Sequence, residues 1–473
     1  MMRVKPIDAA LRASSRPIIV TPTTSSINAA LQAPASPVPP TFLQIDHLRA
    51  NVAGSANDAY LGMVTRISED LDLDVLVAVV TDFIEAHDGL RTWFDRHNPE
   101  FTRHIVDSTD IAFVATGLPF SVDGTDWTSG LRRHFEAVIS PFEWPGSAVA
   151  VIPECVGFNL VFAADHAFSD GISQMLGALE LADRYRQKLS GRLYGAEPSG
   201  SSVEYAMDER IRADDAHDLY PYWEHAMAET GFKLPELAFD LGTVPGQRYC
   251  RQLHDWTLLD RQQTRAFDTM TAQYEATMSE AIFSALALAQ YELTGREHYW
   301  TLNVLATRFG ARFARTQGWL CNFVPVSFTL PAHTNFSSTL SAARSALDRG
   351  RMMSLLPAQI AVERLLRSGR GSELVVREPS FVTLLDLRRP SAAEAPDADT
   401  RIFSADGTTS TVSMWVVRDE FEYSLGIGFP DTPTAWRQLS DYVRRLRHIL
   451  AAIAITGDYC LENAATVTQE SST

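Results

Sequence analysis

The sequence predicts an α/β (α+β) protein with two lobes, each formed by a mixed sheet and helices. Its 473 residues exceed what a single hydrophobic core usually serves. The hydrophobic share of 45% and the charged share of 21% are those of an ordinary globular protein. Apolar segments of strand length alternate along the chain with longer segments of helical periodicity, which indicates a mixed architecture.

An extended N-terminal arm over residues 1–37 is expected to lead into an N-terminal lobe over residues 38–195. The prolines within residues 34–40 fix φ and remove backbone donors, which favours an extended arm. In the lobe, Asp72 is a suitable N-cap for the apolar periodic segment that follows it. We expect a helix over 72–86, strands over 90–94 and 156–164, and a helix over 171–189.

A segment rich in Pro, Gly and Ser, residues 196–245, is expected to connect the lobes and to contain a helix over 205–212. The C-terminal lobe then spans residues 246–460, and a frayed tail covers 461–473. In this lobe we expect helices over 278–294 and 434–455 and strands over 300–306, 323–330, 380–387 and 411–417.

Charge and cysteine usage exclude several classes of function. The formal net charge of −17 repels polyanions, so nucleic acid is not expected as a partner. The four cysteines are scattered, with no pattern of metal-ligand spacing, so we expect neither a metal site nor disulfides. Apolar stretches are too short for a signal peptide or a membrane span, and a cytoplasmic location follows as an expectation.

The most informative segment runs from Asp165 through His166 to Asp170 and Gly171, between a predicted strand and a predicted helix. An imidazole at a strand end has rigid support, and with an ordinary pKa of about 6.5 it can accept a proton. Asp170 is placed to hold the loop, and the Gly171 N–H at a helix start could stabilise an oxyanion. Taken alone, such a turn can also be purely structural.

This segment resembles the His-His-x-x-x-Asp-Gly signature of condensation domains and related free-standing acyltransferases, including the polyketide-associated acyltransferases, with Asp165 in place of the first His. A second block, Thr307-Arg308 followed by residues 318–325, is similar to the family's Gly-Arg and Gly-x-x-x-Asn-x-x-Pro stretch, with Thr307 replacing the Gly. The resemblance covers roughly residues 38–455.

The resemblance implies two chloramphenicol acetyltransferase-like lobes in a V-shaped pseudo-dimer with a central tunnel and His166 near its middle. It also implies that Arg308 pairs with Asp170, and a buried carboxylate would need such a cation. Asp165 could raise the pKa of His166 or cap the loop, and the alternation of side chains along a strand favours the cap. The candidates for the tunnel lining are Asp165, Trp319, Asn322 and Phe381.

The function implied is acyl transfer from a pantetheine thioester, on CoA or on an acyl or peptidyl carrier protein, to a small-molecule alcohol or amine. His166 is the expected general base, no cofactor is expected to stay bound, and the setting is specialised-metabolite or lipid biosynthesis. The product, ester or amide, is left open. One alternative, motivated by Asp165, is an inactive docking domain. Another is a trimeric acetyltransferase of the chloramphenicol type, which the length disfavours, so a monomer is expected.

Overall fold

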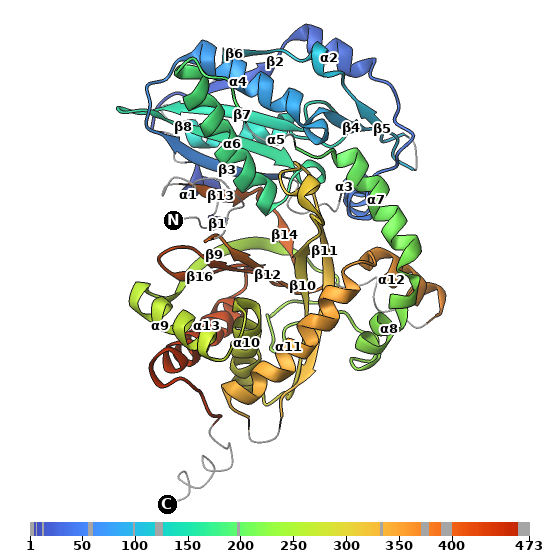
Figure 1. Cartoon of the computed structure of the whole chain (residues 1–473), viewed down its shortest axis with the longest axis vertical. Helices are drawn as coiled ribbons and strands as arrows, with labels where there is room; N and C mark the ends of the chain where they lie inside the picture. Colours follow the sequence, from blue (N-terminus) through green and yellow to red (C-terminus); the bar gives the residue numbers. More distant parts are fainter. Residues whose placement is uncertain are drawn as a thin grey trace, which may run out of the picture.

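Two lobes, each containing a seven-stranded sheet, lie one above the other along the long axis of the molecule (Figure 1). The computed structural model describes residues 4–461 except for 6, 12–13, 55–59, 98–99, 119–125, 196–198, 332–333, 370–377 and 389–399. Of the predicted tail, only Leu461 is therefore among the described residues.

The upper sheet has the strand order β1-β13-β3-β8-β7-β2-β6 and helices on both faces. Its central strand β8 is buried on both sides, which explains the apolar run over residues 160–164. The strands are β1 (Val4–Lys5), β2 (Ile18–Pro22), β3 (Tyr60–Ile67), β6 (Phe113–Gly117), β7 (Ser147–Pro153), β8 (Phe158–Asp165) and β13 (Arg401–Ser404), with a separate β4 (Thr92–Phe94) and β5 (Arg103–Ile105) pair. The helices are α1 (Ile7–Ala10), α2 (Thr24–Leu31), α3 (Phe42–Val52), α4 (Leu73–Ala86), α5 (Trp127–Val138) and α6 (Gly171–Leu189).

The prediction of an extended arm over residues 1–37 is wrong. Strand β2 lies inside the upper sheet, hydrogen-bonded to β6 on one side and β7 on the other, and α2 follows it. The side chains of Ile19 and Val20 are buried on opposite faces of this sheet. Pro17 and Pro22 flank the apolar residues and so remove few ladder donors, because they lie at the strand ends.

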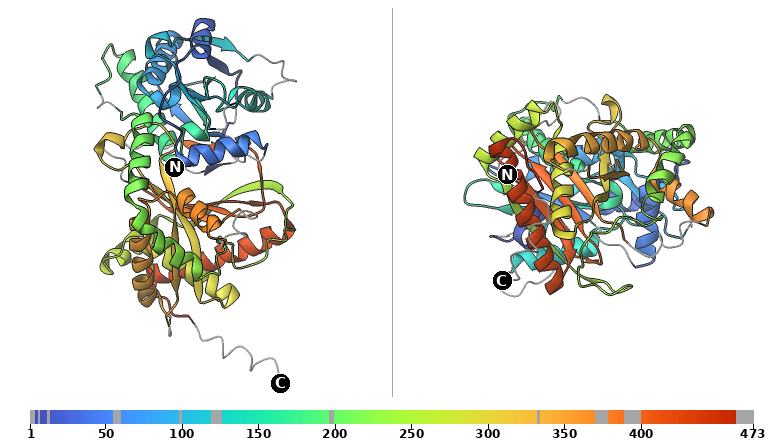
Figure 2. Two further views of the ribbon diagram at one scale, coloured as in Figure 1. Left: turned by 90° about the vertical axis from the view of Figure 1, so that its right-hand side faces the viewer. Right: turned by 90° about the horizontal axis from the view of Figure 1, so that it is seen from below.

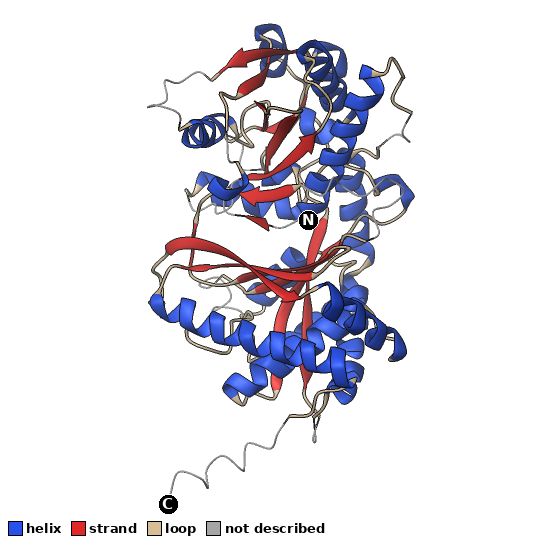
Figure 3. Cartoon of the chain, turned by 90° about the vertical axis from the view of Figure 1, so that its left-hand side faces the viewer, coloured by secondary structure: helices blue, strands red, loops and turns tan. Residues whose placement is uncertain are grey.

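The lower sheet has the order β11-β10-β12-β15-β16-β9-β14, and helices α9, α10, α11 and α13 share its main hydrophobic core. These helices lie on the side of the sheet away from the upper lobe (Figures 2 and 3). The strands are β9 (Tyr249–Leu259), β10 (His298–Ala306), β11 (Cys321–Thr329), β12 (Phe381–Asp386), β14 (Thr408–Thr409), β15 (Ser413–Arg418) and β16 (Tyr423–Pro430). The helices are α9 (Arg261–Gln273), α10 (Met278–Thr294), α11 (Phe336–Met353), α12 (Ala358–Arg367) and α13 (Pro433–Thr456).

Two connections join the lobes. Helices α7 (Ser202–Asp215) and α8 (Tyr220–Ala228) run along one side of the molecule from the upper lobe to the lower (Figure 1). The second connection runs in the opposite direction. After β12 the C-terminal part of the chain returns to the upper lobe, where β13 pairs antiparallel with β3. The segment predicted as the C-terminal lobe, 246–460, therefore contributes a strand to the other lobe, because the chain crosses over after β12.

The crossover strand β13 packs closely against β3 because Gly62 in β3 has no side chain. The ring of Phe403 from β13 fills this space: a Cβ built on Gly62 would lie 2.2 Å from the Phe403 Cζ. Phe403 is fully buried, so it has no free direction in which to move.

We predict that Gly62→Ala lowers the free energy of unfolding by about 1–3 kcal/mol, because the new methyl group overpacks a fully buried contact. Urea denaturation of the variant and the wild type measures the difference. Phe403→Leu provides the control, because the smaller side chain leaves room for the methyl group and should recover part of the loss in the double variant. Equal stability of Gly62→Ala and the wild type would contradict this account of the crossover.

Candidate active site

The turn that carries His166 is fixed at both ends by carboxylates. Strand β8 ends at Asp165, whose Oδ1 accepts a hydrogen bond from the Ala167 N–H (2.8 Å), and His166 opens a short 3-10 turn. At the other end Asp170 is the N-cap of α6, with its Oδ1 accepting from the Ser173 N–H (2.7 Å). The Gln44 side chain of α3 donates to the Ala167 carbonyl (2.7 Å). Little freedom is left to the backbone around His166.

Asp170 and Arg308 come together in a bidentate ion pair. The Arg308 Nη1 lies 2.9 Å from Oδ2 and its Nη2 lies 2.9 Å from Oδ1 of Asp170. The Arg308 side chain is only 7% exposed and the Asp170 side chain only 9%. The Leu320 N–H also donates to the Asp170 Oδ2 (3.0 Å). Burial by itself would raise the pKa of Asp170, but Arg308 and the backbone donors of Ser173 and Leu320 hold it below its ordinary value.

Ser173 extends this contact into a network that joins the lobes. Its hydroxyl accepts from the Arg308 Nη2 (2.7 Å) and from the Gly318 N–H (3.1 Å). The same hydroxyl donates to the Gly318 carbonyl (2.8 Å). Helix α6 of the upper lobe is thus bound to the loop before β11 of the lower lobe. Thr307, which stands where the family has Gly, hydrogen-bonds through its hydroxyl to Tyr205 of α7.

The His166 ring is partly exposed and stacks on Trp319, with 3.8 Å between ring centroids and 30° between planes. Its Nδ1 is buried and has no hydrogen-bond partner among the described residues. Burial is the main cause that lowers the pKa of His166 to about 4, with His47 acting in the same direction and Asp165 and Asp170 opposing it. The imidazole is therefore neutral near pH 7 and able to accept a proton.

His47 of α3 is a site residue that the sequence did not reveal. Its Nε2 lies 2.8 Å from the Asp165 Oδ1, and both side chains are buried. Asp165 therefore caps the turn and pairs with His47, which agrees with the capping alternative. A lone His on a helix more than a hundred residues earlier in the chain carries no local signal of this contact.

Gly171 is the first residue of the 19-residue helix α6. Apart from its chain neighbours and its own helix backbone, a Cβ built on Gly171 would meet no atom of the described residues within 4 Å, so open space borders the helix N-terminus at this position. The positive end of the helix dipole therefore lies beside a region that a ligand could enter.

Asn322 does not line a tunnel as expected. Its Nδ2 donates to the carbonyls of Ser354 (3.0 Å) and Leu356 (2.8 Å). Its Oδ1 accepts from the backbone N–H groups of Phe323 (2.9 Å) and Ala358 (3.0 Å). Because both donors and both acceptor positions are occupied, Asn322 anchors the loop between α11 and α12 and is not available to a ligand.

Of the two aromatic candidates, Trp319 lies against His166, whereas Phe381 lies in a different environment. Phe381 packs edge-on against Phe323, with 5.7 Å between ring centroids, within a cluster that includes Trp300 and Leu302 of β10. Phe381 is partly exposed and packs on the lower sheet, and its place in a tunnel lining stays a prediction.

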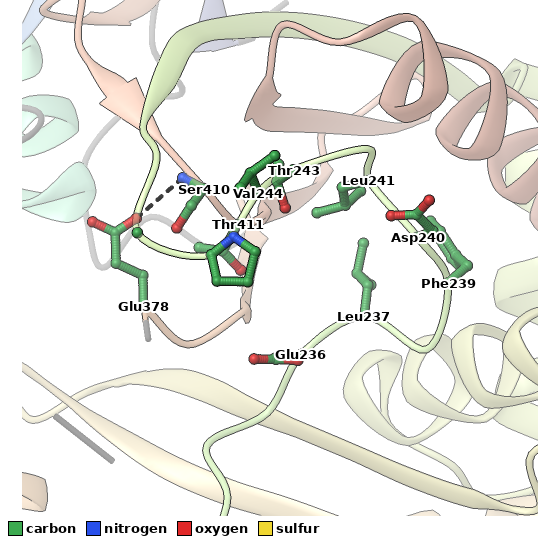
Figure 4. Close-up of a pocket in the computed structure, with 12 residues that line it drawn as sticks. Glu236, Leu237, Phe239, Asp240, Leu241, Thr243, Val244, Glu378, Ser410 and Thr411 are labelled. Atoms are coloured by element: carbon green, nitrogen blue, oxygen red, sulfur yellow. Dashed lines mark hydrogen bonds between the residues drawn. The ribbon is translucent and has the colours of Figure 1, made fainter. Parts of the chain in front are cut away.

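Two cavities of the lower lobe contain no imidazole or thiol in their linings. One, of about 230 Å³, is formed by the end of the interlobe connection together with Glu378, Ser410 and Thr411 (Figure 4). The other, of about 510 Å³, lies beside the N-terminus of α10. Neither offers a general base of the kind that His166 provides, and a tunnel beside His166 stays a prediction.

Within the described ranges, no group of three or more His, Cys, Asp or Glu side chains is arranged to hold a metal ion. Among the helices that the structure describes, none combines the length and apolar character needed to cross a bilayer.

Comparison with known proteins identifies the family. The model of the condensation domain matches residues 55–428, which include both sequence blocks and the ion pair between them. The chain belongs to the condensation-domain family. Among solved structures, the PapA2 acyl transferase superposes with a TM-score of 0.84 at 22% identity, covering 94% of this chain and 99% of that one. The first condensation domain of the CDA synthetase gives 0.69 at 17% identity, covering 89% and 98%.

Relatives of this condensation-domain protein are mycobacterial acyltransferases. The (hydroxy)phthioceranyltransferase PapA1 of Mycobacterium tuberculosis is 27% identical, covering 92% of this chain and 86% of the relative. The acyltransferase PapA3 of the same species is 24% identical over 90% and 92%, and the trehalose-2-sulfate acyltransferase PapA2 of Mycobacterium bovis is 26% identical over 89% and 90%. The predictions of a condensation-type fold and of an acyltransferase are confirmed.

We predict that Asp170→Asn lowers the free energy of unfolding at pH 7 by about 3–5 kcal/mol, because it leaves the buried Arg308 guanidinium without a counter-charge. Asn retains the helix cap, so the loss reports on the ion pair. Chemical denaturation measures it, and Glu363→Gln, which breaks the exposed pair with Arg367, serves as a control with a change below about 1 kcal/mol.

The pH dependence gives a second readout of the same pair. Because the pKa of Asp170 is depressed in the folded state, its contribution to stability is present above the unfolded pKa of about 3.9. This contribution is lost as the pH falls through the folded pKa. Asp170→Asn should lack that acidic loss, and a wild-type pH profile in the variant would contradict the assignment.

Proposed function

We propose that this acyltransferase moves an acyl group from a pantetheine thioester to a hydroxyl group of a small molecule, with His166 as the general base. The observation that carries the proposal is the partly exposed His166 on a turn that Asp165 and Asp170 fix, five residues before the N-terminal glycine of α6. Burial of Nδ1 leaves Nε2 as the nitrogen that faces an acceptor. The donor is carried by CoA or by an acyl or peptidyl carrier protein.

The reaction takes place in one displacement at the thioester carbonyl. The His166 Nε2 takes the proton of the acceptor hydroxyl as its oxygen forms a bond to the carbonyl carbon. The carbonyl oxygen becomes an oxyanion, and the Gly171 N–H at the start of α6 stabilises this charge. The carbon–sulfur bond then breaks, and the departing thiolate takes the proton from His166. No covalent intermediate on the protein is required.

Asp170 takes no part in proton transfer in this scheme. Both of its oxygens are occupied by Arg308, and they also accept the N–H groups of Ser173 and Leu320. Its pKa lies below the ordinary value, so it remains ionised and serves the geometry of the turn. His166 is left as the base.

A sugar hydroxyl is the acceptor that we propose, and the product is then an ester. PapA2 is named for acylating trehalose 2-sulfate and PapA1 for acylating a 2-O-sulfo-trehalose derivative, which supports a related polyol here. The four cysteines are unpaired, one of them buried and three exposed, which supports action in the reducing cytoplasm.

A docking role remains the second candidate, because Asp165 replaces the first His of the signature. The X-domain of teicoplanin biosynthesis, a structural neighbour with a TM-score of 0.62 and 16% identity, is known in complex with OxyB. The neutral His166 and the complete Asp170–Arg308 pair favour catalysis. Turnover of a thioester by the wild type decides between the two.

We predict that His166→Ala lowers kcat by about 10²–10⁴, because the acceptor proton loses its base. Thiol release from octanoyl-CoA with trehalose 2-sulfate, and mass spectrometry of the ester, measure the rate. His217→Ala is the control, because that ring is largely exposed and paired with Asp218.

The pH dependence of the wild type gives a further check. With a His166 pKa of about 4, kcat/KM should stay constant as the pH is lowered from neutrality and fall only near pH 4. Full turnover by His166→Ala would overturn the mechanism.

We predict that Gly171→Ala lowers kcat/KM while the free energy of unfolding stays within about 0.5 kcal/mol of wild type. Apart from chain neighbours and the helix's own backbone, the added methyl group meets no atom of the described residues within 4 Å, so we expect it to interfere with a molecule in the adjacent space. Kinetics with octanoyl-CoA and urea denaturation of the same preparation separate the two effects. Unchanged kcat/KM would show that the substrates do not pass this glycine.

A further inference from the structure

We propose that His47 and Asp165 form a positioning pair that fixes the His166 ring in the orientation needed to accept a proton. The proposal rests on the proposed function of His166 as the base. It assigns a role to Asp165, which stands where the family signature has its first His, and to His47, which lies outside the signature.

Among the described residues, no carboxylate contacts the Nδ1 of His166, although many catalytic histidines have such an orienting contact. In a Ser-His-Asp triad, a carboxylate bound to Nδ1 fixes the tautomer and the rotation of the ring. Here Nδ1 is buried and has no hydrogen-bond partner among the described residues. Packing therefore contributes to the ring orientation, and Trp319, stacked at 3.8 Å between ring centroids, is the aromatic surface against His166.

Trp319 is in turn held by His47. The edge of the His47 ring meets the indole at 5.7 Å between centroids and 87° between planes, and the His47 and His166 rings are 6.3 Å apart. Asp165 fixes His47 through the 2.8 Å contact with Nε2. The same Asp165 oxygen accepts the Ala167 N–H, so one carboxylate sets both the turn that carries His166 and the ring that supports Trp319.

Burial argues for positioning as the role of this pair. Asp165 is fully buried, His47 is 7% exposed, and the second Asp165 oxygen has no partner among the described residues. A buried pair with an unsatisfied oxygen stabilises a fold little, because desolvation offsets its attraction. The contact between His47 and Asp165 instead fixes the position of the His47 ring and, through it, the Trp319 ring beside His166.

The charges around His166 add a property that a purely structural contact would not have. The titratable groups that face His166 are His47 from α3, Asp165 from β8 and Asp170 before α6, and Arg308 pairs with Asp170. After burial, His47 contributes most to lowering the pKa of His166. Removing the His47 ring should therefore raise that pKa as well as loosen the ring.

The test compares two buried histidines of the same lobe. His47→Gln keeps a donor for Asp165 but removes the imidazole ring. His87→Gln is the matched control, because His87 is also buried, lies 3.2 Å from a buried carboxylate of Glu180 and packs against the Phe83 ring. Kinetics use octanoyl-CoA and trehalose 2-sulfate, and nuclear magnetic resonance of the protein labelled with ¹³C-histidine follows the His166 titration, assigned from His166→Ala.

We predict that His47→Gln lowers kcat by about tenfold to a hundredfold with little change in KM, because the base is misoriented after binding. The His166 pKa rises in the same variant. Asp165→Asn, which keeps the cap but not the charge, should also lower kcat, but it should lower the His166 pKa, because the Asp165 carboxylate raises that pKa. His87→Gln should leave both quantities unchanged.

If His47→Gln matches His87→Gln in kcat and in the His166 titration, the pair is structural only and this inference is overturned. Full turnover by His166→Ala would instead overturn the proposed function, so the two failures are distinguishable.

Discussion

The structure depends on one buried ion pair between its lobes. Asp170 belongs to the upper lobe and Arg308 to the lower, and neither charge would be tolerable in the interior without the other. Ser173 and the backbone at Gly318 and Leu320 complete the hydrogen bonding of this contact. Because Asp170 also caps α6, the contact that joins the lobes determines where the turn with His166 lies.

The other links between the lobes serve the same geometry. The crossover strand β13 pairs with β3, which in turn pairs with β8, the strand that ends at Asp165. The connection helix α7 meets the segment of Arg308 through Tyr205 and Thr307. Both sides of the site are therefore held by chain segments from the opposite lobe, and His166 sits on rigid elements and not on a free loop.

Local signals in the sequence were enough for α6 and α10, whose predicted bounds match the structure, because capping residues and apolar periodicity coincide there. They were not enough for β13, whose partner strands are more than three hundred residues away in the chain. They also did not reveal β2, because the prolines and serines around it favour irregular structure. The motif residues His166, Asp170 and Arg308 could be named. Asn322 was misjudged because its amide serves a loop, and His47 was missed because its contact is non-local.

The central claim is that His166 faces the carbonyl carbon of the acyl donor, and a crystal structure with a non-hydrolysable acyl-pantetheine analogue tests it most directly. The account predicts the analogue's carbonyl between the Nε2 of His166 and the N-terminus of α6, beside Gly171. An analogue bound with its carbonyl on the far side of Trp319, or in the cavity lined by Glu378, Ser410 and Thr411, would contradict it.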